Sequence, residues 1–74
     1  MKKKIKIKIK IKVNGKTKSV PENYKVSDLV KNLKIPLKKV AIEINQEIID
    51  KKKVFKINLQ KNDNIEIVHF IGGG

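Results

Sequence analysis

The sequence predicts an α+β domain in which one helix packs across a mixed sheet of four to five strands. Three observations favour this class: a strictly alternating apolar segment with a hairpin signal, a short amphipathic helix, and several strand-like segments that follow it. A hairpin followed by one helix buries its apolar face only if the helix lies across the sheet. Because 74 residues suffice for one small core, we expect a single domain over residues 1–74 with a flexible glycine tail at 72–74.

The first element is a β-hairpin. Residues 5–13 alternate between apolar side chains and lysine, and a period of two indicates a strand with one buried and one solvated face. The residues expected to face the core are Ile5, Ile7, Ile9, Ile11 and Val13. Asn14-Gly15 is typical of a type I′ turn, in which both central residues have positive φ. Residues 16–20 form the second strand, which Pro21 ends because it lacks a backbone donor.

A short helix comes next. Ser27 is expected to cap its N-terminus, and Asp28 places a negative charge in the first turn. One face of the helix carries Leu29, Val30 and Leu33. Pro36 limits the helix to about two turns.

The remaining chain predicts three more strands. Residues 40–44 form the third strand, 45–46 a turn, and 47–49 a short fourth strand. Residues 59–64 are interpreted as a polar turn, and 65–70 form the last strand.

Composition excludes several classes of function. There is no cysteine, and hence no disulfide, no thiol nucleophile and no cysteine zinc site. The single histidine, His69, supports neither a catalytic triad nor a metal site, and no glycine-rich phosphate loop is present. No segment approaches the roughly 20 apolar residues of a membrane span. We therefore expect a soluble, cytoplasmic protein that is not an enzyme and binds no metal or cofactor of its own.

The formal net charge of +12 comes from nineteen lysines, seven acids and no arginine. A polyanion-binding module is one reading of this charge. However, lysine at every second strand position also suits a solvated face and protects an exposed strand from aggregation. Arginine, the usual bidentate reader of guanine and phosphate, is absent, and Tyr24, Phe55 and Phe70 are too scattered to form a base-stacking platform. We expect no nucleic-acid or membrane ligand, and keep polyanion binding as the alternative function.

The C-terminus carries the strongest chemical signal. The chain ends in Gly72, Gly73 and Gly74, directly after an apolar strand. Without Cβ atoms such a tail fits a narrow enzyme channel. The terminal carboxylate is ionised at neutral pH and is a poor electrophile, so it must first be activated, for example as an acyl-adenylate.

The last strand adds a candidate docking surface beside the tail. Its alternation places Ile65 and Ile67 on one side, and Glu66, Val68 and Phe70 on the other. If the first pair packs on the helix, Val68 and Phe70 are exposed next to the tail, as a partner-binding patch requires. The alternative is that residues 51–57, whose structure the pattern leaves open, cover this surface.

Four segments together resemble the ThiS-type sulfur-carrier proteins of thiamine biosynthesis over roughly residues 9–74. They are 13–15 (VNG), 26–30 (VSDLV), 40–49 (VAIEINQEII) and 63–74 (DNIEIVHFIGGG). The resemblance implies a ubiquitin-like β-grasp fold. It also implies that an E1-like adenylating enzyme activates Gly74 with ATP-Mg, that a persulfide donor supplies sulfur, and that thiazole synthase takes it from the resulting thiocarboxylate. Gly72 and Gly73 would then enter partner channels, and Val68, Phe70 and Ile71 would contact partner surfaces.

Two features depart from that family's pattern. Residues 61–63 read Lys-Asn-Asp where the family usually has glycine in the middle, and we expect the turn to survive because asparagine tolerates positive φ. The lysines of residues 2–8 extend the first strand without a family role. Carriers for molybdopterin synthase, tRNA thiolation or lysine conjugation would look much alike and remain alternatives.

Overall fold

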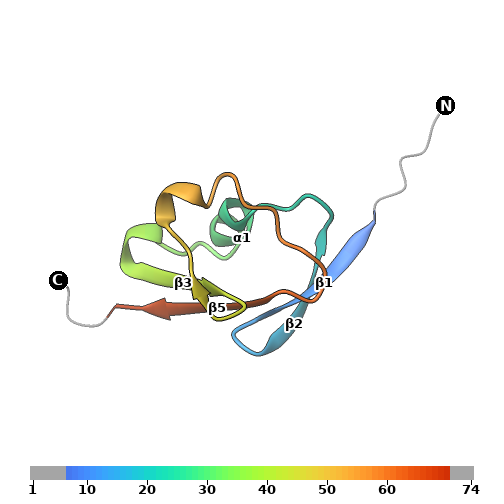
Figure 1. Ribbon diagram of the computed structural model, residues 1–74, viewed down its shortest axis with the longest axis horizontal. Coiled ribbons are helices and arrows are strands. Elements are labelled where there is room, and N and C mark those ends of the chain that lie inside the picture. Colours follow the sequence, from blue (N-terminus) through green and yellow to red (C-terminus); the bar gives the residue numbers. More distant parts are fainter. Residues whose placement is uncertain (1–6, 71–74) are drawn as a thin grey trace.

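The computed structural model describes residues 7–70, which form a five-stranded sheet with one helix on one face (Figure 1). The strand order is β2-β1-β5-β3-β4, and only the β1–β5 pair is parallel. The elements are β1 (Lys8–Val13), β2 (Lys16–Pro21), α1 (Val26–Asn32), η1 (Leu37–Lys39), β3 (Val40–Ile44), β4 (Glu47–Ile48), η2 (Lys51–Lys53) and β5 (Asn64–His69). The predicted fold class is therefore confirmed.

The hairpin turn forms as predicted. Asn14 has φ 50° and Gly15 has φ 83°, and Val13 pairs with Lys16 across the two-residue loop. This pair of positive φ angles gives the turn a twist that matches the flanking strands.

The apolar side of β1 is only partly buried. Ile11 is 1% exposed and Ile9 is half-buried, whereas Ile7 is 54% exposed, so the expectation that Ile7 faces the core is wrong. The reason is that β5 pairs only with Lys12 and Val13, which leaves the N-terminal end of β1 beyond the packed layer. Ile5 lies outside the described residues.

Helix α1 starts earlier than predicted. Its N-cap is Lys25, not Ser27, and the carboxylate of Asp28 accepts a hydrogen bond from the Lys25 backbone amide at 2.9 Å. The backbone amides of Val26 and Ser27 donate to the carbonyls of Ile57 and Val54, at 3.0 and 2.9 Å. These tertiary partners satisfy the first amides of the helix, so a hydroxyl cap is not needed.

The C-terminal end of α1 precedes Pro36. The helix ends at Asn32, with Leu33 as the C-cap, and Lys34 turns the chain with φ 58°. Leu29 and Val30 are buried as predicted, whereas Leu33 is 36% exposed because the helix has already ended there.

The chain after β3 closes the core from the helix side. Asn45 and Gln46 form the predicted turn, with φ 52° and 73°. Val54, in the segment whose structure the pattern left open, is buried. Leu59 is also buried, so its assignment to a purely polar turn is wrong.

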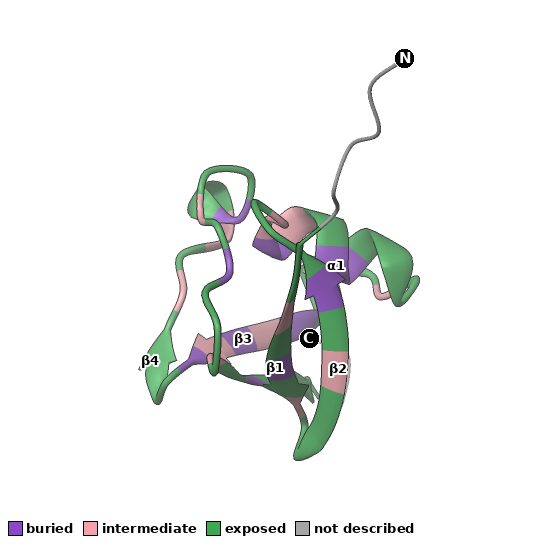
Figure 2. Ribbon diagram, turned by 90° about the vertical axis from the view of Figure 1, so that its right-hand side faces the viewer, coloured by how far each residue is buried: buried purple, intermediate pink, exposed green. Residues whose placement is uncertain are grey.

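Buried residues, purple in Figure 2, lie on α1 and on the strands of the sheet, and they form one hydrophobic cluster. Its members are Ile11, Val20, Val26, Leu29, Val30, Val40, Ile42, Ile44, Val54, Leu59, Ile65 and Ile67. The opposite face of the sheet has no covering layer in the described part of the chain. β5, the strand that leads to the C-terminus, forms part of this open face.

Candidate functional site

Strand β5 carries the candidate site and occupies the centre of the sheet. It pairs with β3 over five residue pairs, from Ile44↔Ile65 to Val40↔His69, and with β1 over two. Both neighbours pair with the start of β5, and β3 alone pairs with the part that leads to the tail, as far as His69.

The hairpin turn braces the middle of β5. The side-chain Oδ1 of Asn14 accepts a hydrogen bond from the backbone amide of Ile67 at 2.8 Å. The backbone amide of Asn14 in turn donates to the carbonyl of Ile65 at 2.9 Å. The two bonds continue the β1–β5 connection beyond the end of β1.

The turn before β5 survives the departure from the family pattern. Asn62 adopts φ 70°, the left-handed conformation expected of it. The carboxylate of Asp63 accepts from the backbone amide of Gln60 at 2.7 Å and from the side-chain amide of Asn45 at 3.0 Å. The carbonyl group of that Asn45 side chain accepts from the backbone amide of Asn64 at 3.0 Å, which fixes the start of the strand.

The other end of β5 is also anchored. The backbone amide of Phe70, one residue beyond the strand, donates to the carbonyl of Lys39 at 2.9 Å. The expected partner-contacting residue Ile71 and the tail residues Gly72, Gly73 and Gly74 lie outside the described residues. Their predicted roles stay predictions.

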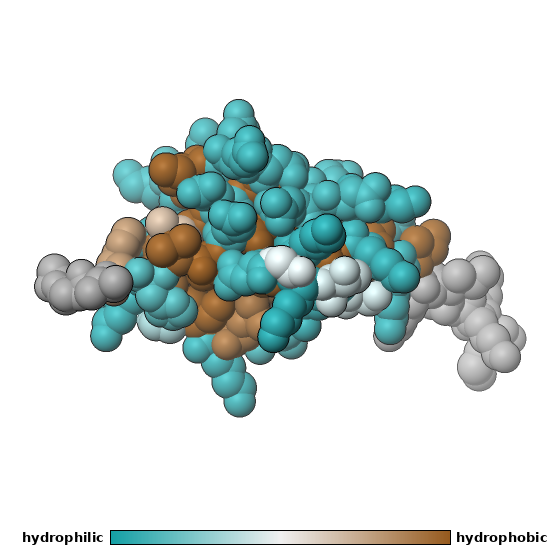
Figure 3. Space-filling view, turned by 90° about the horizontal axis from the view of Figure 1, so that it is seen from below, coloured by the Kyte–Doolittle hydropathy of each residue, from teal (hydrophilic) through white to brown (hydrophobic). Residues whose placement is uncertain are grey.

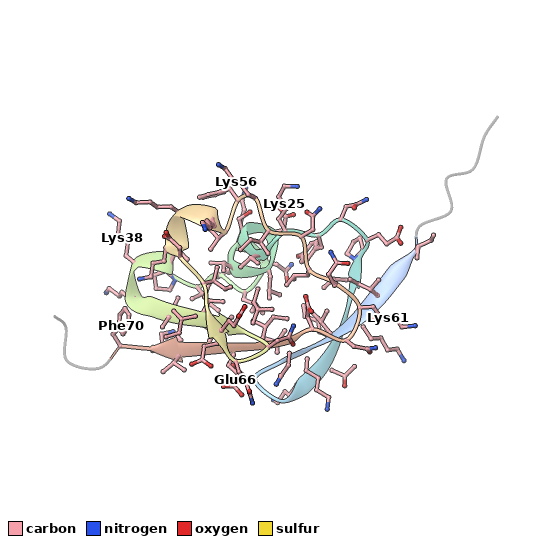
Figure 4. All side chains as sticks on the ribbon, in the orientation of Figure 1. Lys25, Lys38, Lys56, Lys61, Glu66 and Phe70 are labelled. Carbon is pink, nitrogen blue, oxygen red and sulfur yellow. The ribbon has the colours of Figure 1, made fainter. Side chains whose placement is uncertain are left out.

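The alternation predicted for β5 is confirmed. Ile65 and Ile67 are buried, whereas Val68 is 53% and Phe70 57% exposed. Of the segment 51–57, Lys51 reaches Phe70: its Nζ lies 4.9 Å from the ring centroid and 3.4 Å from the carbonyl of Lys38. Figure 4 shows Phe70 at the end of β5 and Glu66 pointing away from the helix. The segment therefore leaves most of this surface uncovered.

The open face around Val68 combines apolar and acidic side chains. Val68 pairs with Ala41, and Glu66 pairs with Glu43 directly beside them. Ile48, which pairs with Glu43 from the other side, is 75% exposed. Seen from below the sheet, apolar side chains gather over the part of this face nearer the C-terminus (Figure 3). We call Ala41 and Val68 of this face, together with the exposed Phe70 just beyond β5, the tail-proximal patch.

Within residues 7–70, the structure contains no group of three or more potential metal ligands. His69 is exposed at the end of β5, where it pairs with Val40.

The helix described for this chain is too short and too polar to cross a membrane. Burial, and secondarily the charge of Asp28, raises the pKa of Tyr24, which lies just before α1 and not near the tail. Among the described residues, the candidate site thus rests on the exposed apolar side chains near the tail.

Sequence reasoning missed the side chains that hold β5 in place. Asn14 and Asn45 were recognised only as turn residues, yet each also bonds the backbone of a distant segment. Lys51, whose ammonium group lies over Phe70, belongs to a segment with no clear pattern. Polar turn residues are the only signal in the sequence, and they do not reveal which strand they contact.

Comparison with known proteins finds relatives of this chain in sequence and in structure. A sequence model of the ThiS family matches residues 10–74. The sulfur carrier protein ThiS of Bacillus subtilis is 43% identical over 49 residues, which are 66% of this chain and 74% of that protein.

Two longer relatives are named thiazole synthase. Those of Paramagnetospirillum magneticum and Magnetococcus marinus are 36% and 35% identical over 61 residues, which are 82% of this chain. The match spans only 19% of each of these proteins, so a segment similar to this chain forms part of a much longer one.

The structure is similar to that of the thiamine biosynthesis protein ThiS from Geobacter metallireducens. Its crystal structure has a TM-score of 0.78 at 29% identity, covering 89% of this chain and 100% of that one. The solution structure of a thiamine biosynthesis protein from the same organism has a TM-score of 0.72, covering 89% and 88%. The similar fold agrees with the ubiquitin-like β-grasp architecture expected from the sequence.

Proposed function

The chain belongs to the ThiS family, and from that membership we propose that it is a sulfur carrier protein of thiamine biosynthesis whose reacting group is the carboxylate of Gly74. In this role the protein is a cosubstrate of other enzymes and not itself an enzyme. The observation that carries the proposal is the exposure of Val68 in β5 and of Phe70 just beyond it, shortly before the glycine tail and on a backbone segment held by hydrogen bonds.

The chemistry begins with activation, because a carboxylate is a poor electrophile at neutral pH. An E1-like adenylating enzyme lets the Gly74 carboxylate attack the α-phosphorus of ATP, which releases pyrophosphate and forms an acyl-adenylate. The terminal sulfur of a persulfide then displaces AMP, and a second thiol cleaves the resulting acyl disulfide. The product is a thiocarboxylate on Gly74, from which sulfur passes into the thiazole ring. ATP-Mg is a substrate of the partner enzyme, and this chain needs no cofactor of its own.

The residues of this chain bind the partner enzyme and extend the reacting carboxylate into it. The tail-proximal patch, with Ile71, contacts the partner, and Gly72 and Gly73 pass through a channel too narrow for side chains. The hydrogen bond from Phe70 to Lys39 fixes where the tail begins, so docking of the patch also aims the tail.

The partners are the adenylating enzyme, a persulfide sulfur donor and thiazole synthase. The two thiazole synthases that contain a segment similar to this chain support the last of these. We assign this chemistry to the cytoplasm, where a reducing environment preserves the thiols and the persulfide that it requires.

Intact-mass measurement tests the proposal. The protein is incubated with ATP-Mg, the adenylating enzyme of the same organism and a persulfide donor. We expect a mass gain equal to replacing one oxygen by sulfur, located on the fragment that contains Gly74 and absent without ATP. A variant lacking Gly73 and Gly74 is the control and should gain nothing. No gain in the full chain, with an enzyme shown to thiolate another carrier, would overturn the proposal.

Transfer to the acceptor is tested separately. Thiocarboxylated protein should support thiazole formation when it is mixed with thiazole synthase. Support for molybdopterin synthesis or tRNA thiolation instead, with no thiazole formed, would assign the same carrier chemistry to one of the other pathways.

A further inference from the structure

A row of three exposed lysines lies on the open face of the sheet. Lys8, Lys10 and Lys12 alternate along β1 with Ile9 and Ile11, which turn toward the core. We infer that this lysine row guides thiazole synthase into place by meeting a strip of carboxylates on that enzyme, beside the site where the tail-proximal patch docks. The inference rests on the proposed sulfur-carrier function.

On the open face of the hairpin, the positive charge lies in this one row. Alternate residues of a strand are about 7 Å apart, so the three side chains extend along about 14 Å, and a Debye length of about 8 Å in physiological salt lets neighbours act together. On β2 the residues paired with them are the uncharged Thr17, Ser19 and Pro21. Solvation of the face alone does not explain why the paired positions on β2 carry no charge.

The lysines of β2 lie on the other face of the sheet. Lys16 and Lys18 pair with Val13 and Ile11, so they project from the helix side of the sheet and not from the open face. The row on β1 is therefore a feature of the open face itself.

The lysine row and the tail-proximal patch belong to one continuous surface. Strand β1 lies next to β5, with Lys12 paired to Asn64, and Val68 lies four residues further along β5 on the same face. Val68 is therefore about 14 Å from the Lys12 end of the row and about 27 Å from Lys8, within the span of an interface of about 800 Å² per partner. Figure 3 shows mostly hydrophilic side chains over the part of the face that lies further from the C-terminus. A protein that covers the patch and extends across β5 to β1 meets the charge of the row.

The chemistry of the row favours an acidic protein over two other occupants. A second copy of this chain carries the same net charge of +12 and is repelled. Single-stranded nucleic acid usually requires aromatic side chains on which bases stack, and β1 and β2 contain none. Exposed charges at the rim of an interface mainly raise the association rate and make it salt-dependent.

The test compares two variants with the same loss of charge. In one, Lys8, Lys10 and Lys12 are changed to glutamine; in the control, the exposed Lys31, Lys52 and Lys56 of α1, η2 and the turn after it are changed to glutamine. Association with the thiazole synthase of the same organism is followed by stopped-flow fluorescence at several ionic strengths. We expect the first variant to associate about tenfold more slowly at low salt, with a weaker salt dependence and a dissociation rate within about twofold of the original. The control should associate within about twofold of the original.

Three results would overturn the inference. An equal fall in both variants would mean that net charge alone acts, and no fall would mean that the row is only solvated. A mixed-sequence single-stranded oligonucleotide that binds through the row, with enzyme association unchanged, would assign the row to nucleic acid. The mass gain on Gly74, measured with saturating adenylating enzyme, remains a separate readout of the carrier function. Steering can thus fail while thiocarboxylate formation persists.

Discussion

The side chain of Asn14 accepts a hydrogen bond from the backbone amide of Ile67 at 2.8 Å, across 53 positions of the chain. This bond joins the hairpin turn to the strand that precedes the tail. Ile67 is 6% exposed, so its amide has little access to water as a substitute partner. The turn therefore holds the strand of the candidate site in place as well as closing the hairpin.

The first prediction concerns this bond. Asn14→Gly keeps the positive φ of the turn accessible but removes the acceptor, which leaves a buried amide without a partner. We expect the free energy of unfolding to fall by about 1–3 kcal/mol, measured by urea denaturation. Asn14→Asp, which retains an acceptor oxygen and tolerates the same backbone angles, is the matched control and should lose less. Equal losses in the two variants would show that the bond does not matter.

The second prediction concerns the turn before β5. Asn62 has φ 70°, a conformation that β-branched residues adopt only with strain. Asn62→Val should therefore destabilise the protein by about 1–3 kcal/mol. Asn62→Gly, which restores the residue usual in the family, should change the stability by less than about 1 kcal/mol. Thermal and urea unfolding of both variants measure the difference, and a valine variant as stable as the glycine variant would contradict the strain.

Much of the fold could be predicted because its signals are local. Alternation identifies β1 and β5, and Asn14-Gly15 identifies the turn, since these patterns depend on neighbouring residues alone. The errors arise where distant segments decide the outcome. Ser27 does not cap α1 because the carbonyls of Val54 and Ile57 reach the first amides of the helix.

The candidate site was predictable to a similar extent. The exposure of Val68 follows from the parity of a strand whose other side is apolar. The bond from Asn14 to β5, and the position of Lys51 over Phe70, require knowledge of which elements meet. Local patterns do not contain that information, because it depends on the order of strands in the sheet.

The third prediction concerns pH. Burial first, and the charge of Asp28 second, raise the pKa of Tyr24 above its ordinary value of 10.0. Because the folded protein holds this proton more tightly than the unfolded chain, the contribution of Tyr24 to stability is complete below pH 10 and is lost as the pH rises through the raised pKa. Lysines titrate in the same range, so the useful quantity is the difference in unfolding free energy between the wild type and Tyr24→Phe. That difference should shift against the wild type as the pH rises above 10. A difference independent of pH would contradict the assignment.

The fourth prediction concerns the tail-proximal patch. Val68→Asp places a charge on an exposed position of β5, where the side chain has no core contacts to lose, so the thermal midpoint should fall by only a few degrees. Binding to the adenylating enzyme should weaken by about tenfold or more, because the carboxylate must be desolvated in an apolar contact. Binding is measured by titration calorimetry, and circular dichroism verifies the fold of each variant.

Thr17→Asp is the matched control for that measurement. Thr17 is exposed on the same open face, and its replacement by aspartate adds the same charge as Val68→Asp. It lies on β2, which β1 separates from β5, the strand that leads to the tail. A charge that acts through the overall field would weaken binding from both positions, whereas a charge that disrupts direct contact would act mainly from position 68. Val68→Ala removes apolar area without adding charge and should weaken binding less than Val68→Asp. If all three variants bind as the wild type does, the patch is not where the adenylating enzyme docks.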